Sequence, residues 1–237
     1  MSTEEIVSRL LYRDALMLVI DKPAGLPVHP GPGGGQTLVH HLDALRFGLP
    51  RRPEAAHRLD RDTAGCLILG RHPKALARLG ELFRSNAVDK AYWAVVEGGP
   101  AEEEGEIALS LGPQSPERPW WMKVDPTGQA ALTRWRVLGR SPSPGAEGGA
   151  NLTLLELRPI TGRTHQLRVH CAAMGWPILG DTLYGAAPRQ GGPGLHLLAR
   201  SVSVPLYPKK PAITVEAPVP EHMLERVGAC GLPPGAT

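Results

Sequence analysis

The chain has 237 residues, of which 28 are Gly and 25 are Pro, and 42% of it is hydrophobic. This hydrophobic content excludes a disordered chain, and the Gly residues lack the three-residue period of collagen. The 26 Lys and Arg residues only slightly outnumber the 23 Asp and Glu residues, so the formal net charge of +3 does not by itself identify a partner.

The cysteines and the first residues bear on where the protein works. The three cysteines are far apart and form no C-x-x-C pair, which argues against a disulfide framework and a structural zinc site. The opening MSTEEIVSRL is acidic, where a signal peptide needs a basic start and an apolar run. No stretch approaches the ~18 consecutive apolar residues of a membrane span. We therefore expect a cytoplasmic protein without membrane contact.

The first half of the chain predicts two strands and a helix. The apolar run 16–20 predicts a strand that ends in a turn at 21–25. Residues 66–69 predict a second, buried strand. A helix follows, because Pro73 suits a first turn and apolar residues recur behind it at helical spacing. We expect this helix to end near 85–86.

The second half predicts further short strands and two helices. The strands cover 91–96, 131–138 and 151–157. One helix is expected over 164–174, capped by Thr164 or Thr161 and stopped by Gly175, and a short one over 221–227. Because strands outnumber helices without alternating with them, a mixed, largely antiparallel α+β fold with flanking helices fits better than a doubly wound one.

Two Gly-rich segments predict loops. The segment GPGGG at 31–35 is not a phosphate-binding loop, because no G-K-[ST] follows it. The segment SPSPGAEGG at 141–149 is too short for a domain linker and predicts a hairpin loop or a small insertion.

The positive charge is concentrated in one region. From Arg158 to Lys210 there are seven basic residues and one acid, Asp181, which gives that stretch a net charge of +6. Such a region indicates either a surface that faces a polyanion or an ordinary solvated face, and charge alone leaves both open.

The segment HRLDRDTAG at 57–65 is the richest in charged groups. In it Asp60 and Asp62 lie between arginines, directly before the predicted strand 66–69. The pattern fits a catalytic carboxylate held by guanidinium groups, but it also fits a polar turn with local ion pairs. On pattern alone the polar turn is favoured.

The segment TGRTHQLRVH at 161–170 carries planar hydrogen-bonding side chains at five of the eight positions from Arg163 to His170. They are Arg163, His165, Gln166, Arg168 and His170. Such groups suit phosphates and base edges. The two histidines are five residues apart, not at the i, i+4 spacing of a zinc protease, so we expect no metal site.

Taken in order, the motifs resemble those of the RluA-type family of RNA pseudouridine synthases. The matching segments are HRLDRDTAG at 57–65, KAY at 90–92, RPITGRTHQLRVH at 158–170 and PILGDTLYG at 177–185. With a first motif at 12–30 and the pair Ala217-Pro218, the resemblance covers about residues 12–218. Several long motifs in one order are far more specific than any single one.

The resemblance implies roles for individual residues. Asp60 corresponds to the catalytic aspartate, Tyr92 to the tyrosine that stacks on the target uracil, and Arg168 to the arginine that pairs with the aspartate. Arg58 corresponds to the arginine that displaces the target base and fills its place. The neighbouring residues that we expect to contact the RNA are His57, Thr63, Arg163, His165 and Gln166. The family uses no cofactor and no metal.

The implied reaction converts uridine to pseudouridine in structured transfer or ribosomal RNA. A base inside a helix is unreachable, so it must be flipped out, for which an arginine wedge and an aromatic platform are suited. Desolvation in a closed pocket would raise the pKa of Asp60, and Arg168 would oppose this. Whether Asp60 attacks the sugar C1′ or abstracts a proton from C2′ stays open.

Two other functions were weighed against isomerisation. One is an RNA-binding module of the same fold without catalysis. The other is a hydrolase that uses Asp60, Asp62 and His57, which would be sensitive to a chelator if it held a metal. The isomerase is favoured because all four residues of its expected set are present, namely Arg58, Asp60, Tyr92 and Arg168.

The resemblance also implies a domain organisation. We expect a single catalytic domain over 1–237 that acts as a monomer. A short extension over 1–11 takes the place of the S4-type RNA-binding domain that many relatives carry. A helix and tail follow at 219–237.

Overall fold

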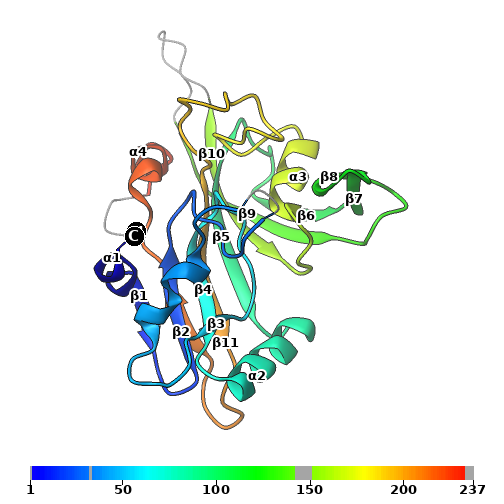
Figure 1. The fold of residues 1–237 in the computed structure, drawn as a ribbon. Helices are drawn as coiled ribbons and strands as arrows, with labels where there is room; N and C mark the ends of the chain where they lie inside the picture. Colours follow the sequence, from blue (N-terminus) through cyan, green and yellow to red (C-terminus); the bar gives the residue numbers. More distant parts are fainter. Residues whose placement is uncertain (1, 32–33, 142–150, 233–237) are drawn as a thin grey trace. The chain divides into compact units, whose positions relative to one another are not determined.

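The computed structural model describes residues 2–31, 34–141 and 151–232. They divide into two compact units, whose helices and strands are labelled in Figure 1. The first holds the described residues of Met1–Lys90 and Ala199–Pro218, and the second holds those of Ala91–Leu198 and Val219–Thr237. The single catalytic domain expected from the sequence stays a prediction.

The first unit is built on a sheet of mostly buried strands. In spatial order these are β1 (Leu10–Arg13), β2 (Met17–Lys22), β4 (Ala64–Gly70) and β11 (Leu197–Val204), with the short strands β3 (Glu54–Ala55) and β12 (Ile213–Glu216) paired to β4 and β11. The β1–β2, β2–β4, β3–β4 and β11–β12 ladders are antiparallel. Every residue of β4 is buried, which confirms the strand predicted over 66–69.

Three helices belong to this unit. They are α1 (Thr3–Ser8), the 3-10 helix η1 (Leu38–Leu45) and α2 (Pro73–Arg84). As predicted, α2 begins at Pro73, where a missing backbone N–H is harmless. The ring of His72 caps the same end by accepting the N–H of Ala75 (3.2 Å).

Four further strands of the described residues build the second unit. In spatial order these are β5 (Asp89–Glu97), β10 (Leu152–Pro159), β9 (Leu132–Arg140) and β6 (Glu104–Ala108). Their ladders are antiparallel, and β7 (Leu111–Ser115) and β8 (Arg118–Val124) form an antiparallel hairpin of their own. This confirms the strands predicted in the second half of the chain and the mixed, largely antiparallel α+β class.

Helices α3 (Gln166–Ala173) and α4 (Glu221–Ala229) complete the second unit. The predicted threonine caps of α3 are wrong. Its N-cap is His165, whose φ of +53° is left-handed and which makes no side-chain capping bond. Thr161 instead donates its hydroxyl to Oε1 of Gln166 (2.7 Å). The predicted end is confirmed, since Gly175 follows the helix with a φ of +84° that suits glycine.

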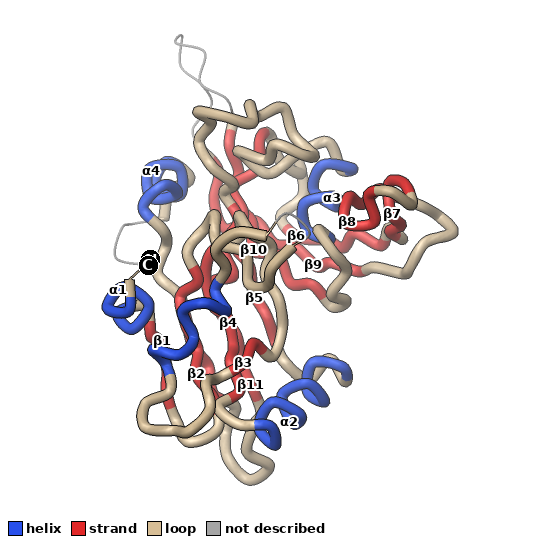
Figure 2. Tube along the Cα trace, in the orientation of Figure 1, coloured by secondary structure: helices blue, strands red, loops and turns tan. Residues whose placement is uncertain are grey.

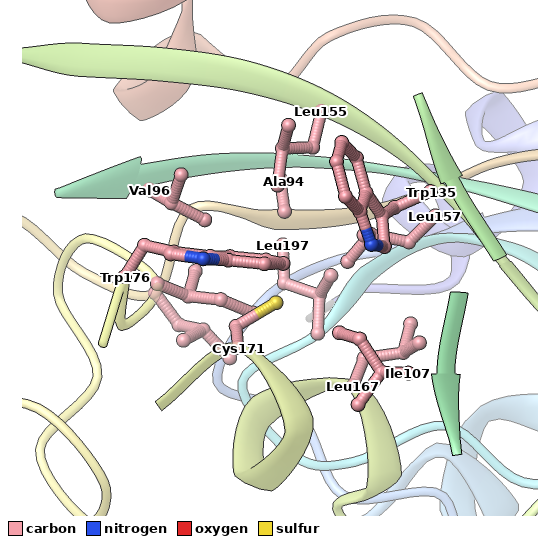
Figure 3. Packing of buried hydrophobic residues seen from close by; sticks show 12 residues of the cluster. Ala94, Val96, Ile107, Trp135, Leu155, Leu157, Leu167, Cys171, Trp176 and Leu197 are labelled. Atoms are coloured by element: carbon pink, nitrogen blue, oxygen red, sulfur yellow. The ribbon is translucent and has the colours of Figure 1, made fainter. Parts of the chain in front are cut away.

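A hydrophobic cluster fixes α3 in the second unit (Figure 3). Leu167 and Cys171 of α3 pack there with Trp135 of β9 and with Trp176, and the two indole rings meet edge to face at 5.8 Å. Burial of large aromatic surface is the main stabilising term in such a cluster. Figure 2 shows α3 beside the β7–β8 hairpin.

The two predicted loops are only partly described. Residues 31, 34 and 35 have no helix or strand structure, whereas 32–33 and 142–150 lie outside the described residues. Within the described ranges, no helix is long and apolar enough to span a membrane.

Candidate functional site

Asp60 lies on a tight turn immediately before strand β4. The carbonyl oxygen of Asp60 accepts the N–H of Thr63 (3.2 Å), which closes the turn. Leu59 and Thr63 on either side are buried, whereas Asp60 itself is half-buried. The turn is therefore anchored at both ends by the core while the carboxylate stays within reach of solvent.

The buried ammonium group of Lys22 holds the same turn through hydrogen bonds. Its side chain is fully buried, and Nζ donates to the carbonyl oxygens of Pro23 (2.8 Å), Leu26 (2.9 Å) and Arg61 (3.0 Å). An ammonium has three hydrogens, so these three acceptors satisfy it completely. Desolvation lowers the pKa of Lys22 to about 8, although the charges of Asp62, Asp60 and Asp21 oppose the shift.

His57, a predicted RNA contact, takes part in the sheet of the first unit. Its Nε2 accepts the N–H of Ile68 on β4 (3.0 Å), and its ring lies 4.7 Å from that of Phe83. Desolvation, together with the charge of Lys90, lowers the pKa of His57 to about 4. A neutral ring whose Nε2 lone pair is occupied is poorly suited to activate water, which argues against the hydrolase hypothesis. Arg58, the next residue, is exposed.

Tyr92 lies on β5 in the second unit. It is paired in register with Leu157 of β10, and its half-buried ring packs against the hydrophobic cluster around Trp135. The ladder between β5 and β10 thus fixes the backbone of Tyr92, and the packing against the cluster restricts its ring.

Arg168 is held in the second unit by a buried ion pair that the sequence did not predict. Its Nε and Nη2 donate to the two carboxylate oxygens of Asp181 at 2.8 and 2.7 Å. The two side chains are only 4% and 0% exposed. Burial alone would raise the pKa of Asp181, but Arg168 and the N–H groups of Leu183 and Tyr184 outweigh it and hold that pKa below its usual value.

Tyr184 links Arg168 to its surroundings. Its ring lies 5.3 Å from the guanidinium carbon of Arg168, a cation–π distance. Its hydroxyl accepts the N–H of Met122 on β8 (3.0 Å) and lies 2.8 Å from Nδ1 of His165. Two hydrogen bonds to one hydroxyl tie the left-handed residue His165 to the β7–β8 hairpin.

Gln166, a predicted RNA contact, is buried and fully engaged inside the protein. Its Nε2 donates to the carbonyl of Leu132 (3.0 Å) and to Oγ1 of Thr133 (2.9 Å). Its Oε1 accepts from Thr161 (2.7 Å) and from the backbone of Arg163 (3.0 Å). Because an amide has two donors and two lone pairs, this side chain has no further strong hydrogen bond to offer, and its direct contact with RNA stays a prediction.

The hydroxyl of Thr133 continues the chain of hydrogen bonds from Gln166 to His170. Nε2 of His170 faces the carbonyl of Leu109 (3.0 Å) and Nδ1 faces Oγ1 of Thr133 (2.9 Å). A carbonyl can only accept, so Nε2 carries the hydrogen and the Thr133 hydroxyl donates to Nδ1. Burial lowers the pKa of His170, so the ring is a neutral structural link between α3 and β9.

The predicted residues are distributed over both units. The first holds His57, Arg58, Asp60 and Thr63, and the second holds Tyr92, Arg163, His165, Gln166 and Arg168. Within each unit the structure adds residues that sequence reasoning missed: Lys22 in the first, and Thr133, Asp181 and Tyr184 in the second. Asp181 and Tyr184 lie in the motif 177–185, but the motif did not reveal which residue they contact.

The structure refines the basic stretch 158–210. Arg168 and Arg200 are both buried, and Arg200 pairs with Glu216 (2.8 Å) and bonds the carbonyl of Ala217. Arg158 bridges to Glu156 (2.9 Å). The net charge of this stretch therefore overstates the positive charge that it presents to solvent. The remaining basic residues of the stretch, all exposed, are Arg163, Arg189, Lys209 and Lys210.

Over the described ranges, no group of three or more His, Cys, Asp or Glu side chains is placed to hold a metal ion.

Comparisons with known proteins agree with these motifs. The family model described as RNA pseudouridylate synthase matches residues 16–173. An uncharacterised RNA pseudouridine synthase of Zymomonas mobilis is 43% identical over 218 residues, covering 91% of this chain and 95% of the relative. The ribosomal large subunit pseudouridine synthase C of Haemophilus ducreyi is 36% identical over 92% of this chain and 68% of the relative. Among solved structures, human RNA pseudouridylate synthase domain containing 4 matches with a TM-score of 0.77 and 26% identity over 95% of each chain.

Proposed function

The chain belongs to the RNA pseudouridylate synthase family, and from this premise we propose that it isomerises specific uridines in structured RNA to pseudouridine. In this reaction the bond between uracil and the sugar breaks, the base rotates, and it is rejoined to the sugar through C5. The RNA keeps its atoms and its oxidation state.

We assign the essential carboxylate to Asp60. The observation that carries this assignment is the geometry of the turn on which Asp60 lies. Lys22 donates to the carbonyl of Arg61 in this turn, and the N–H of Thr63 closes it. Catalysis requires reacting groups to be held before the substrate arrives, because their ordering then costs nothing during the reaction. Attack on C1′ and proton abstraction from C2′ both begin from an ionised carboxylate in this place.

The remaining roles follow from the motif positions. Arg58 is exposed on the same segment and suits the group that displaces the target base. The ring of Tyr92 stacks on the flipped uracil. By its motif position Arg168 is the arginine that pairs with the catalytic aspartate, and the ion pair with Asp181 fixes its guanidinium plane for that role.

We propose ribosomal or transfer RNA as the substrate class, acted on in the cytoplasm by a monomer. The name of the Haemophilus ducreyi relative supports the ribosomal alternative. The exposed residues Arg163, Arg189, Lys209 and Lys210 supply phosphate contacts, so binding should weaken steeply as salt rises. If the affinity for RNA did not change with salt concentration, these four cations would not contact the RNA phosphates.

The test compares two neighbouring carboxylates. Asp60→Asn should abolish pseudouridine formation, measured by chemical labelling of total RNA after incubation with the purified protein. RNA affinity should stay within about tenfold of wild type, because phosphate contacts dominate it.

Asp62→Asn is the matched control, since Asp62 forms a partly exposed ion pair with Arg61. It should keep near wild-type activity. Equal loss in both variants would fail to single out Asp60 as the essential carboxylate, and wild-type turnover in Asp60→Asn would refute the assignment. A wild-type protein that binds RNA but forms no pseudouridine would support the non-catalytic alternative.

A further inference from the structure

The β7–β8 hairpin exposes aromatic surface that the fold does not use. Trp120 on β8 is 50% exposed, the largest exposed fraction among the large hydrophobic side chains of the described residues. Val124 at the end of the same strand is 38% exposed. In Figure 1 the labels β7 and β8 mark this hairpin beside α3.

One cation lies against an aromatic ring of the hairpin, and a second is exposed on the same strand. The indoles of Trp120 and Trp121 lie nearly parallel, with an interplanar angle of 13° and centroids 6.3 Å apart. The guanidinium of Arg118 lies 5.5 Å from the ring of Trp121. Lys123 is exposed on the same strand, and Glu117 is the acidic residue at the turn.

The base of the hairpin is anchored, so the exposed end has a defined position. Leu111 is buried with Ala131 and Val169, and Met122 and Tyr184 pack against them. The backbone of Leu111 exchanges hydrogen bonds with Gln129 at 2.9 and 2.8 Å.

The anchoring also connects the hairpin to the proposed catalytic arginine. The N–H of Met122 donates to the hydroxyl of Tyr184 (3.0 Å), and the ring of Tyr184 lies 5.3 Å from the guanidinium of Arg168. Met122 is two residues from Trp120 along β8. RNA that touched this strand would therefore lie close to a residue assigned to the reaction.

We propose that Trp120, with Arg118 and Lys123, forms a docking surface for an unpaired nucleotide of the substrate RNA outside the uridine that is modified. A base would stack on the indole of Trp120, and the two cations would contact the adjoining phosphates. Stacking on an exposed aromatic side chain next to basic residues is how proteins hold single-stranded nucleic acid. This inference rests on the proposed function, because it takes RNA as the ligand.

Two features disfavour a protein partner at this place. Pro113 on β7 and Pro119 on β8 lack a backbone N–H, so these edges are poor templates for an added strand. One half-exposed indole at a hairpin also offers much less area than the roughly 800 Å² per partner of a stable protein interface.

The test uses a probe that cannot be a substrate. A fluorescently labelled oligoadenylate of about twelve nucleotides contains no uridine, so its binding is independent of catalysis. Trp120→Ala should weaken its affinity, measured by anisotropy, by about fivefold or more. Trp120→Phe should restore most of the affinity because it keeps a stacking face.

The matched control is Leu224→Ala on α4, which removes an exposed hydrophobic side chain of the same unit, 43% exposed. It should bind the probe within twofold of wild type. Ultraviolet cross-linking followed by peptide mapping should place the adduct on residues 118–124. Unchanged affinity in Trp120→Ala, or adducts elsewhere only, would overturn the proposal.

The two proposals fail in different ways. If the wild-type protein forms no pseudouridine but Trp120→Ala still weakens oligoadenylate binding, the proposed function fails and the docking surface stands. If the wild-type protein forms pseudouridine but Trp120→Ala binds the oligoadenylate as tightly as wild type, only the docking-surface proposal fails.

Discussion

Asp181 holds Arg168 in a buried, bidentate ion pair, with N–O distances of 2.8 and 2.7 Å between side chains that are almost entirely removed from solvent. The planar guanidinium matches the carboxylate through two parallel hydrogen bonds, which fixes its orientation as well as its position. Arg168 therefore reaches its proposed role already oriented by a residue 13 positions further along the chain.

Asp181→Asn should destabilise the protein strongly. The change takes the Asp181 carboxylate charge away from the buried Arg168 guanidinium, at a cost of about 3–5 kcal/mol in the free energy of unfolding. Chemical denaturation at pH 7 measures this. The matched control is Glu106→Gln, which breaks an exposed pair with Arg134 and should cost at most about 1 kcal/mol.

The same variant also tests the positioning of Arg168. Under conditions where Asp181→Asn remains folded, kcat should fall while RNA affinity stays within a few-fold of wild type, because the altered group orients a catalytic side chain. If Asp181→Asn and Glu106→Gln lowered the free energy of unfolding equally, the buried pair of Arg168 would contribute no more to stability than the exposed pair of Arg134.

Lys22→Met should lower both stability and activity. Methionine fills similar volume but leaves the carbonyls of Pro23, Leu26 and Arg61 without a donor. We expect a loss of about 2 kcal/mol, because unsatisfied buried acceptors are costly while the removed buried charge partly compensates. Turnover should also fall, since the Asp60 turn loses its support. The exposed Lys74 on α2 provides the control, and Lys74→Met should change neither the melting temperature nor kcat.

Thr133→Val should uncouple α3 from β9. The hydroxyl of Thr133 both accepts from Gln166 and donates to His170, so valine leaves Nδ1 of His170 without its donor and removes one of the two acceptors of the Gln166 amide. The expected cost is about 2–4 kcal/mol. Thr214→Val, at an exposed pair with Ser203, should change stability by only about 0.5 kcal/mol. A loss in Thr133→Val no larger than this would contradict the hydrogen-bond chain.

The stability of the protein should decrease as the pH falls from about 6.5 to about 4. The pKa of His57 is lowered from 6.5 to about 4 in the folded protein. In that interval the unfolded chain binds a proton that the folded protein does not, so acid favours unfolding. His170 and His196, whose pKa values burial also lowers, add to the effect in the same direction.

His57→Gln should reduce this pH dependence by up to about 1.4 kcal/mol per pH unit, the value for one proton. Denaturation curves at several pH values measure the slope. The exposed His29 supplies the matched change, His29→Gln, which should leave the profile as in wild type. An unchanged slope in His57→Gln would mean that His57 does not contribute to the acid response.

Several features were determined by the sequence alone. The strand at β4 and the helix that begins at Pro73 follow from local apolar patterns, whose periodicity is a property of the chain itself. The motif around Asp60 and the order of the later motifs indicated the family, and the family-model match over residues 16–173 confirmed it. The largely antiparallel α+β class followed from strands that do not alternate with helices.

Only the tertiary structure decided which side chains meet. No local pattern reveals that Lys22 bonds the carbonyl of Arg61, 39 residues away, or that Asp181 rather than another acid holds Arg168. It also decided which residues of a motif face inward, so that Gln166 and His170 form an internal hydrogen-bond chain. These contacts depend on backbone segments brought together by the burial of apolar surface, which periodicity does not encode. Likewise, the segment 57–65 fitted both a polar turn and a held carboxylate, and only the fold showed a turn before β4 that carries a half-buried Asp60.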